Sequence, residues 1–218
     1  MTNEDILEAI EPKRRSNGRV YNGDLKSYGL QLLKTREDLS ELIIGKNQDV
    51  DFVFFHAILT RDKKNFRKHL EDIDPYLDTF DSWDDTDNII THFKKPIDFD
   101  FFYKMVERYL KSDNPYVRRL GYVGFIKADL RPKQNCYQII KLFKNTQEHT
   151  LIMAQGWLMA EMYINNPKLM YDYFMASNLS YKILSTAISK CTDSFRISPA
   201  EKTELRKIRT TLKQRRKN

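Results

Sequence analysis

The sequence predicts an all-α protein of the HEAT or armadillo class, in which pairs of short helices stack into a solenoid. Apolar residues recur at spacings of three and four along the segments 52–59, 102–110 and 152–163, which is typical of helices that bury one face. Glycine and proline number only seven each and gather at junctions, and the alternation typical of strands is hard to find. Short helices are marginal alone, and pairs that recur about every 35 to 45 residues match the HEAT and armadillo period.

Three helix starts are marked by a capping side chain followed by proline at the first helical position. These starts are Asn114-Pro115, Asn166-Pro167 and Ser198-Pro199. Glu201 also completes a capping box with Ser198. Apolar periodicity places the other boundaries to within several positions. The helices are expected near 26–35, 50–59, 62–71, 74–92, 98–111, 115–129, 135–145, 148–164, 166–176, 180–191 and 198–216.

Gly121 and Gly124 fall inside the helix expected near 115–129, where glycine lowers helix propensity. This cost is tolerated where a neighbouring backbone or a ligand comes close. We expect the close packing of a neighbouring helix to be the reason.

Length and composition predict a single domain over residues 1–218, with a polar N-terminal segment over 1–23 and a basic C-terminal helix over 198–218. With 41% hydrophobic residues, the chain can bury a sizeable core. No apolar run reaches the length of a membrane span, and the segment after Met1 lacks the apolar region of a signal peptide. Cys136 and Cys191 form no Cys-x-x-Cys pair, which favours a reducing compartment. We therefore expect a cytoplasmic, nucleoid-associated protein.

The net charge of +7 comes from the C-terminal end of the chain. From Arg196 onward, nine Lys or Arg residues stand against Glu201 and Glu204, an excess of seven. By contrast, residues 71–87 contain eight Asp or Glu and no Lys or Arg, a strip that a polyanion should avoid. Charge is therefore patchy, and nucleic acid is a compatible partner rather than a required one.

The C-terminal helix combines an apolar seam with a basic stripe. Leu205, Ile208 and Leu212 repeat at helical spacing and are expected to dock on the rest of the protein. The basic residues that follow one another at spacings of three or four are Lys202, Arg206, Arg209, Lys213 and Arg216. A docked helix with this stripe can contact DNA phosphates without reading sequence; a merely solvated terminal face is the alternative.

Three short polar-aromatic elements lie within the helical pattern. They are Ser82-Trp83-Asp84-Asp85-Thr86-Asp87, Tyr116-Val117-Arg118-Arg119 and Gly156-Trp157. Trp83 and Asp87 are four residues apart and share one helix face. Arg118 and Arg119 follow a capped helix start, where backbone N–H groups already favour an anion. If the second helices of successive pairs line one surface, these side chains would surround a cationic or phosphate-bearing ligand.

Each element also has a purely structural interpretation. Trp83 can be a core aromatic, and Asp87 a solvated or capping acid. The two arginines can form ion pairs with Asp residues of the preceding helix. Trp157 lies on a largely apolar stripe that would normally be core. Spacing alone leaves these alternatives open.

Taken together, the three elements resemble the DNA alkylation repair family of AlkD-type glycosylases in their order and approximate separations. The resemblance runs from about Lys26, where Tyr28-Gly29-Leu30 is similar to a family segment, through Asp193-Ser194-Phe195, and covers most of the chain. It implies HEAT-like repeats in a C-shaped solenoid whose concave face holds DNA. It also implies a monofunctional glycosylase that removes positively charged alkylpurines, such as 3-methyladenine and 7-methylguanine, from duplex DNA in base-excision repair without a deep base-flipping pocket.

Carried over position by position, the resemblance makes Asp87 the catalytic carboxylate. Trp83 and Trp157 would form the aromatic walls of the site. Arg119 would contact the DNA backbone at the lesion, and Arg118 could take that role instead.

The chain departs from the family pattern at three places. Tyr116, in the DNA-binding element, stands where family members often have tryptophan. The acidic strip around Asp87 is dense, so most of its acids should point away from DNA. The polar segment before Gly23 implies a reduced first repeat, which would weaken the initial clamping of DNA and leave the catalytic residues unaffected.

Other kinds of site lack a motif. The chain has neither a Gly-rich phosphate loop nor a nucleophile motif, and two cysteines cannot hold an Fe–S cluster. Four histidines are isolated from Cys and acid partners at metal spacing: His56, His69, His92 and His149. We therefore expect no metal, no cofactor, no membrane partner and a monomer. The rival interpretation is a catalytically silent HEAT-like scaffold that binds nucleic acid or protein.

Overall fold

The computed structural model describes residues 1–61 and 65–215, and all regular secondary structure in these ranges is helical. The chain groups into two compact units, Met1–Lys94 and Lys95–Asn218. No helix in the described ranges is long and apolar enough to cross a membrane. A single domain over 1–218 stays a prediction, as does the C shape with a concave DNA-binding face.

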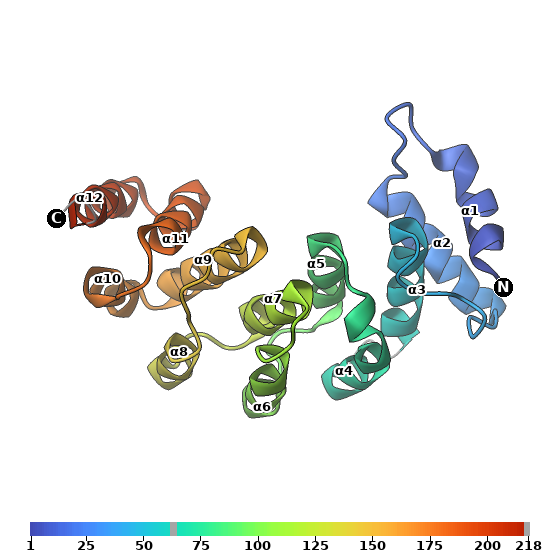
Figure 1. Cartoon of the computed structure of the whole chain (residues 1–218), viewed down its shortest axis with the longest axis horizontal. Coiled ribbons are helices and arrows are strands. Elements are labelled where there is room, and N and C mark those ends of the chain that lie inside the picture. The colour runs from blue at the N-terminus through green and yellow to red at the C-terminus, as the bar shows by residue number, and fades with distance from the viewer. Residues whose placement is uncertain (62–64, 216–218) are drawn as a thin grey trace. The chain divides into compact units, whose positions relative to one another are not determined.

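The first unit is built around α3, which packs against α1, α2, α4 and α5. Most side chains of α3 are buried, because the helix is apolar on most of its circumference. Figure 1 shows α2, α3 and α4 following one another as neighbouring helices. The elements, with η for a 3-10 helix, are α1 (Asn3–Ile10), η1 (Glu11–Lys13), α2 (Asn22–Thr35), α3 (Gln48–Arg61), α4 (Phe66–Ile73), η2 (Asp74–Thr79) and α5 (Trp83–His92).

In the second unit, α9 has more buried residues than any other described helix, and it packs against α7, α10 and α11. Helices α7, α9 and α11 follow one another in one row, and α6, α8 and α10 form a second row (Figure 1). This stacking of successive pairs confirms the predicted helical-repeat class. The elements are α6 (Phe99–Tyr109), α7 (Pro115–Val123), η3 (Gly124–Lys127), α8 (Lys133–Ile140), α9 (His149–Asn165), α10 (Pro167–Ala176), α11 (Tyr181–Asp193) and α12 (Pro199–Arg215).

Two of the three predicted caps are present. Asn114 Oδ1 accepts a backbone N–H of α7 at 2.8 Å, and Ser198 and Glu201 exchange hydrogen bonds at the start of α12. The prediction of the third cap, at Asn166, is wrong. Although α10 begins after Asn166, the buried Asn166 side chain makes no capping bond and donates to the carbonyl of Leu130 at 2.6 Å. Its amide joins the start of α10 to the segment before α8, and so is not available for capping.

Two helix starts lie where the sequence pattern predicts none. Thr2 and Asp5 form a capping box at α1, inside the polar segment 1–23. Ser82 and Asp85 form another at α5, so the single helix expected over 74–92 is divided into η2 and α5. Both boxes follow the pattern Ser/Thr-x-x-Asp, in which each side chain accepts the other residue's backbone N–H.

Close packing of α6 explains both helical glycines, as predicted. A Cβ atom on Gly124 would overlap the ring of Phe102, and one on Gly121 would lie 3.3 Å from the Leu110 side chain. The helix expected over 115–129 is also shorter than predicted. It ends at Val123 and continues as the 3-10 helix η3.

Gly124→Ala is expected to lower the free energy of unfolding by about 1 to 3 kcal/mol, as overpacking of a well-filled core does. The ring of Phe102 is fully buried, so it cannot swing into solvent to make room. Urea denaturation measures the change. The control is Gly23→Ala, where the new methyl group meets the exposed ring of Tyr21. Unaltered stability of the Gly124 variant would contradict the packing explanation.

Candidate nucleic-acid interface

The capping box at Ser82 places Trp83 at the first position of α5, with its side chain turned outward. Trp83 is 56% exposed, whereas Ile89 and Ile90 on the same helix are buried and anchor it. The interpretation of Trp83 as a core aromatic is therefore wrong. An indole held at a fixed helix start presents its face to a ligand without further ordering of the backbone.

Asp85 and Asp87 lie two residues apart and have different surroundings. Asp85 is buried and accepts the backbone N–H groups of Asp81 and Ser82 at 3.1 and 3.0 Å. Burial raises the pKa of Asp85, and these hydrogen bonds oppose the rise. Asp87 is half-buried, and its Oδ1 atom lies 3.3 Å from the Thr86 hydroxyl. Asp85 is thus committed to the helix cap, and Asp87 follows Trp83 by one turn.

Arg118 and Arg119 make contacts near the start of α9. Arg119 is 6% exposed, and its Nη1 donates to the carbonyl of Thr150 at 3.2 Å. Arg118 is half-buried and its Nη2 lies 2.9 Å from Glu148 Oε2. The structural alternative was an ion pair with an Asp residue of the preceding helix. It is wrong for Arg118, because the carboxylate that pairs with Arg118 belongs to Glu148, thirty residues later in the chain. A phosphate that reaches Arg118 must compete with Glu148.

Trp157 lies on the one stripe of α9 that is not buried. The half-buried side chains of this stripe, at spacings of three, four and seven, are Thr150, Met153, Trp157 and Ile164. Next to Trp157, Gly156 packs against α11, where a Cβ atom would lie 2.7 Å from Thr186 Cγ2. Trp157 is therefore not a fully buried core residue. Tyr116, at the second position of α7, is likewise half-buried.

The apolar seam of α12 is buried as predicted, whereas the members of the basic stripe differ in their surroundings. Leu205, Ile208 and Leu212 are buried. Two members of the stripe are exposed, Arg206 and Lys213. The others are Lys202, which is half-buried; Arg209, whose Nη1 donates to Ser189 Oγ on α11 at 3.2 Å; and Arg216, which lies outside the described residues.

The predicted site residues are divided between the two units. Trp83 and Asp87 belong to the first unit, and the other predicted residues belong to the second. Within the first unit, α5 brings Trp83 and Asp87 onto one face. Within the second unit, α7 and α9 pack together and carry Arg118, Arg119 and Trp157. The convergence of both groups around one ligand stays a prediction.

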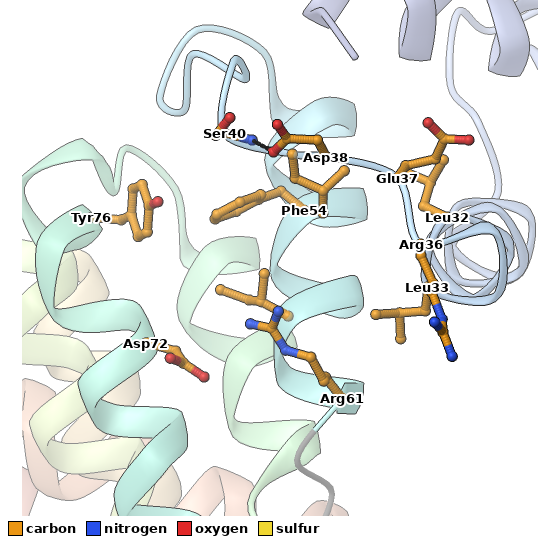
Figure 2. A pocket seen from close by; sticks show the side chains of 12 residues that line it. Leu32, Leu33, Arg36, Glu37, Asp38, Ser40, Phe54, Arg61, Asp72 and Tyr76 are labelled. Carbon is orange, nitrogen blue, oxygen red and sulfur yellow. Dashed lines mark hydrogen bonds between the residues drawn. The ribbon is translucent and has the colours of Figure 1, made fainter.

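Two cavities lie away from the predicted site residues. One cavity, of about 470 Å³, lies in the first unit. Figure 2 shows the side chains of Arg61 and Asp72 lining it from α3 and α4. In the second unit a groove of about 700 Å³ runs between α10 and α12 beside Tyr163 and Tyr171. None of the predicted site residues lines either cavity.

His56 and His92 form a pair, although their positions in the sequence indicate only isolated side chains. His56 Nδ1 and His92 Nε2 are 3.2 Å apart, while 36 residues separate them along the chain. Only the packing of α3 on α5 brings them together, so no local spacing could indicate the pair. Across residues 1–61 and 65–215, no group of three or more His, Cys, Asp or Glu side chains is placed to hold a metal ion.

The family of the chain follows from comparison with known proteins. A family model described as DNA alkylation repair enzyme matches residues 20–190. The match spans α2 through most of α11, includes both tryptophans and Asp87, and stops before α12. Comparison with curated proteins gives no match. Because the family match covers well over half of the chain, the protein belongs to the family of DNA alkylation repair enzymes.

Proposed function

We propose that the protein is a monofunctional DNA glycosylase that hydrolyses the N-glycosidic bond of 3-methyladenine and 7-methylguanine in duplex DNA. The observation that carries the proposal is the exposed Trp83 indole one turn before the Asp87 carboxylate, on a helix whose start is held by a capping box. Duplex DNA with alkylated bases is the proposed partner of a cytoplasmic, nucleoid-associated monomer, and the site needs neither metal nor cofactor.

Such a site suits substrates that already carry positive charge. A cationic alkylpurine is a good leaving group, so the protein mainly has to stabilise the oxocarbenium-like sugar as the glycosidic bond breaks. The Asp87 carboxylate does so electrostatically and orients the attacking water. The base leaves with the bonding electron pair, and the water adds to the sugar carbon and loses a proton.

The two indoles act on the same cationic substrate. Trp83 and Trp157 offer faces of negative potential, each contributing about 0.5 to 2 kcal/mol depending on how far the cation is desolvated. Neutral bases gain little, because their departure needs protonation and the proposed residues include no evident general acid. The substrate class is therefore cationic alkylpurines. Release of hypoxanthine or uracil as fast as 7-methylguanine would refute this specificity.

The two arginines have different roles in the proposal. Arg119 contacts the DNA backbone at the lesion, and its bond to Thr150 sets its position relative to α9. Arg118 is a second backbone contact, which exchanges Glu148 for a phosphate when DNA binds. Tyr116 borders the same backbone at the capped start of α7, where N–H groups favour an anion.

The stripe on α12 should supply affinity that is independent of sequence. The double variant Arg206→Gln/Lys213→Gln is expected to weaken binding to undamaged duplex. Its plot of log K against log salt should be less steep by about 0.9 for each phosphate that the variant no longer neutralises, or about 2 in total. Fluorescence anisotropy at several salt concentrations measures the slope. Lys168→Gln, on α10, is the control. An unchanged slope in the double variant would identify a merely solvated face.

Base release tests the proposal directly. Purified protein is incubated with methylated duplex DNA, and the release of 7-methylguanine and 3-methyladenine is measured beside binding to undamaged duplex. Release of both bases, with no strand cleavage, is the expected result. Binding without release would instead identify a catalytically silent helical scaffold that binds DNA.

A further inference from the structure

Phe195 is completely exposed, at 103% of the reference area, in the segment between α11 and α12. Single exposed apolar side chains are common on protein surfaces and alone carry no argument. Phe195 differs in two respects. The chain around it is held on both sides, and it belongs to the segment next to α9, the helix that carries Trp157.

The anchors on both sides of Phe195 are specific. Both terminal nitrogens of Arg196 donate hydrogen bonds to the buried carboxylate of Glu161, Nη1 to Oε2 at 2.9 Å and Nη2 to Oε1. The backbone N–H of Arg196 also donates to Ser194 Oγ at 3.2 Å, and Ile197 is buried. The charge-assisted fork ties the Arg196 side chain to α9, while the hydrogen bond to Ser194 and the burial of Ile197 restrain the backbone next to Phe195. The ring of Phe195 is therefore presented on an ordered segment.

The same anchors locate Phe195 relative to Trp157. Glu161 follows Trp157 by four residues, one turn along α9, so side chains at these positions lie near each other on the helix surface. Through Arg196, Phe195 is thus tied to the turn of α9 next to Trp157. The basic stripe is close as well, because Arg209 of α12 contacts Ser189 near the end of α11.

We propose that Phe195 is an apolar wedge that enters a base step of bound DNA beside the Trp157 site. The inference rests on the proposed function for its DNA partner. A phenyl ring has no donor or acceptor, so it cannot read bases, but apolar side chains inserted between base pairs unstack them and deform the duplex. Stacking of one base on an aromatic ring is strong and tolerant of sequence. Neighbouring cations on α12 hold the backbone while the ring enters the step.

Phe195→Ala tests the wedge without disturbing the fold, because the side chain buries no surface. Binding is measured to undamaged duplexes that carry 2-aminopurine at successive positions, since this base fluoresces more strongly when unstacked. The wild-type protein should raise the emission at one step. Phe195→Ala should abolish that rise and weaken binding by about tenfold, the loss expected for one stacked base. Phe195→Leu should keep most of the emission, because leucine also acts as a wedge. Tyr137→Ala, which removes another exposed aromatic of the same unit, should match the wild type.

The outcomes separate this inference from the proposed function. If the wild type releases 7-methylguanine and Phe195→Ala binds and unstacks DNA equally well, the wedge is refuted and the glycosylase stands. If the wild type unstacks DNA through Phe195 and releases no base, the glycosylase is refuted and the wedge stands. A third result, loss of self-association in Phe195→Ala with DNA binding unchanged, would assign the ring to contact with a second copy and also refute the wedge.

Discussion

Asp87→Asn is expected to slow the release of 7-methylguanine by about 10² to 10³-fold, while binding to undamaged duplex stays at the wild-type level. Removing one preorganised group that stabilises transition-state charge typically costs this much. Asparagine has nearly the shape of aspartate, so α5 and its capping box at Ser82 should be preserved. Single-turnover release from methylated duplex measures the chemical step, and anisotropy measures binding.

The matched control for this variant is Asp78→Asn, which removes a charge from the same acidic strip at an exposed position. Asp78 lies in η2, before the capping box that starts α5. Its loss should leave release and binding unchanged. An Asp87 variant that keeps the wild-type rate would exclude Asp87 as the catalytic carboxylate, and equal losses in both variants would assign the effect to the net charge of the strip.

The second large effect concerns stability, at Asp51. Asp51 is buried on α3 and its Oδ1 accepts the backbone N–H of Gly45 at 3.0 Å. Burial raises its pKa to about 6 in spite of this hydrogen bond, and the charges of Asp85 and Asp81 add to the rise. At neutral pH the folded protein therefore holds a costly buried charge. Asp51→Asn should raise the free energy of unfolding by about 2 to 3 kcal/mol at pH 7.

The pH dependence of this gain has a definite sign. A pKa that is higher in the folded state than in the unfolded chain contributes stability below the unfolded value of 3.8, and this contribution is lost as pH rises through about 6. The gain from Asp51→Asn should therefore be full above pH 6 and vanish near pH 4. Urea denaturation at both pH values checks it, with Asp78→Asn as the control. A constant gain at all pH values would show that packing, not ionisation, is responsible.

Local sequence patterns predicted most of the helices, and the helix caps show which features such patterns cannot predict. Asn114 and Ser198 cap helices as expected, because a cap needs only partners within three residues. Ser82 uses the same chemistry without a following proline, so the break before α5 was missed. Asn166 looked like a cap, but its side chain bonds to Leu130, 36 residues away. No short pattern contains that information.

The candidate site was predicted residue by residue, but its surroundings were not. The tryptophans were equally compatible with a core, and only their accessibility in the folded protein places Trp83 outward and leaves Trp157 half-buried. No sequence motif indicates that Glu148 pairs with Arg118, because the two residues are far apart in the chain. Only the packing of α7 on α9 brings them together.

By itself the sequence determined the helical class, the family elements at Trp83, Arg119 and Trp157, and the buried seam of α12. All of these depend on spacing within a few turns, because 3.6 residues per turn decide which side chains share a face. Only the tertiary structure decided that Trp83 is exposed, that Glu148 pairs with Arg118, and that the Phe195 side chain is fully exposed. Exposure and ion pairing depend on what packs against a residue, and here the packing elements come from thirty or more residues away.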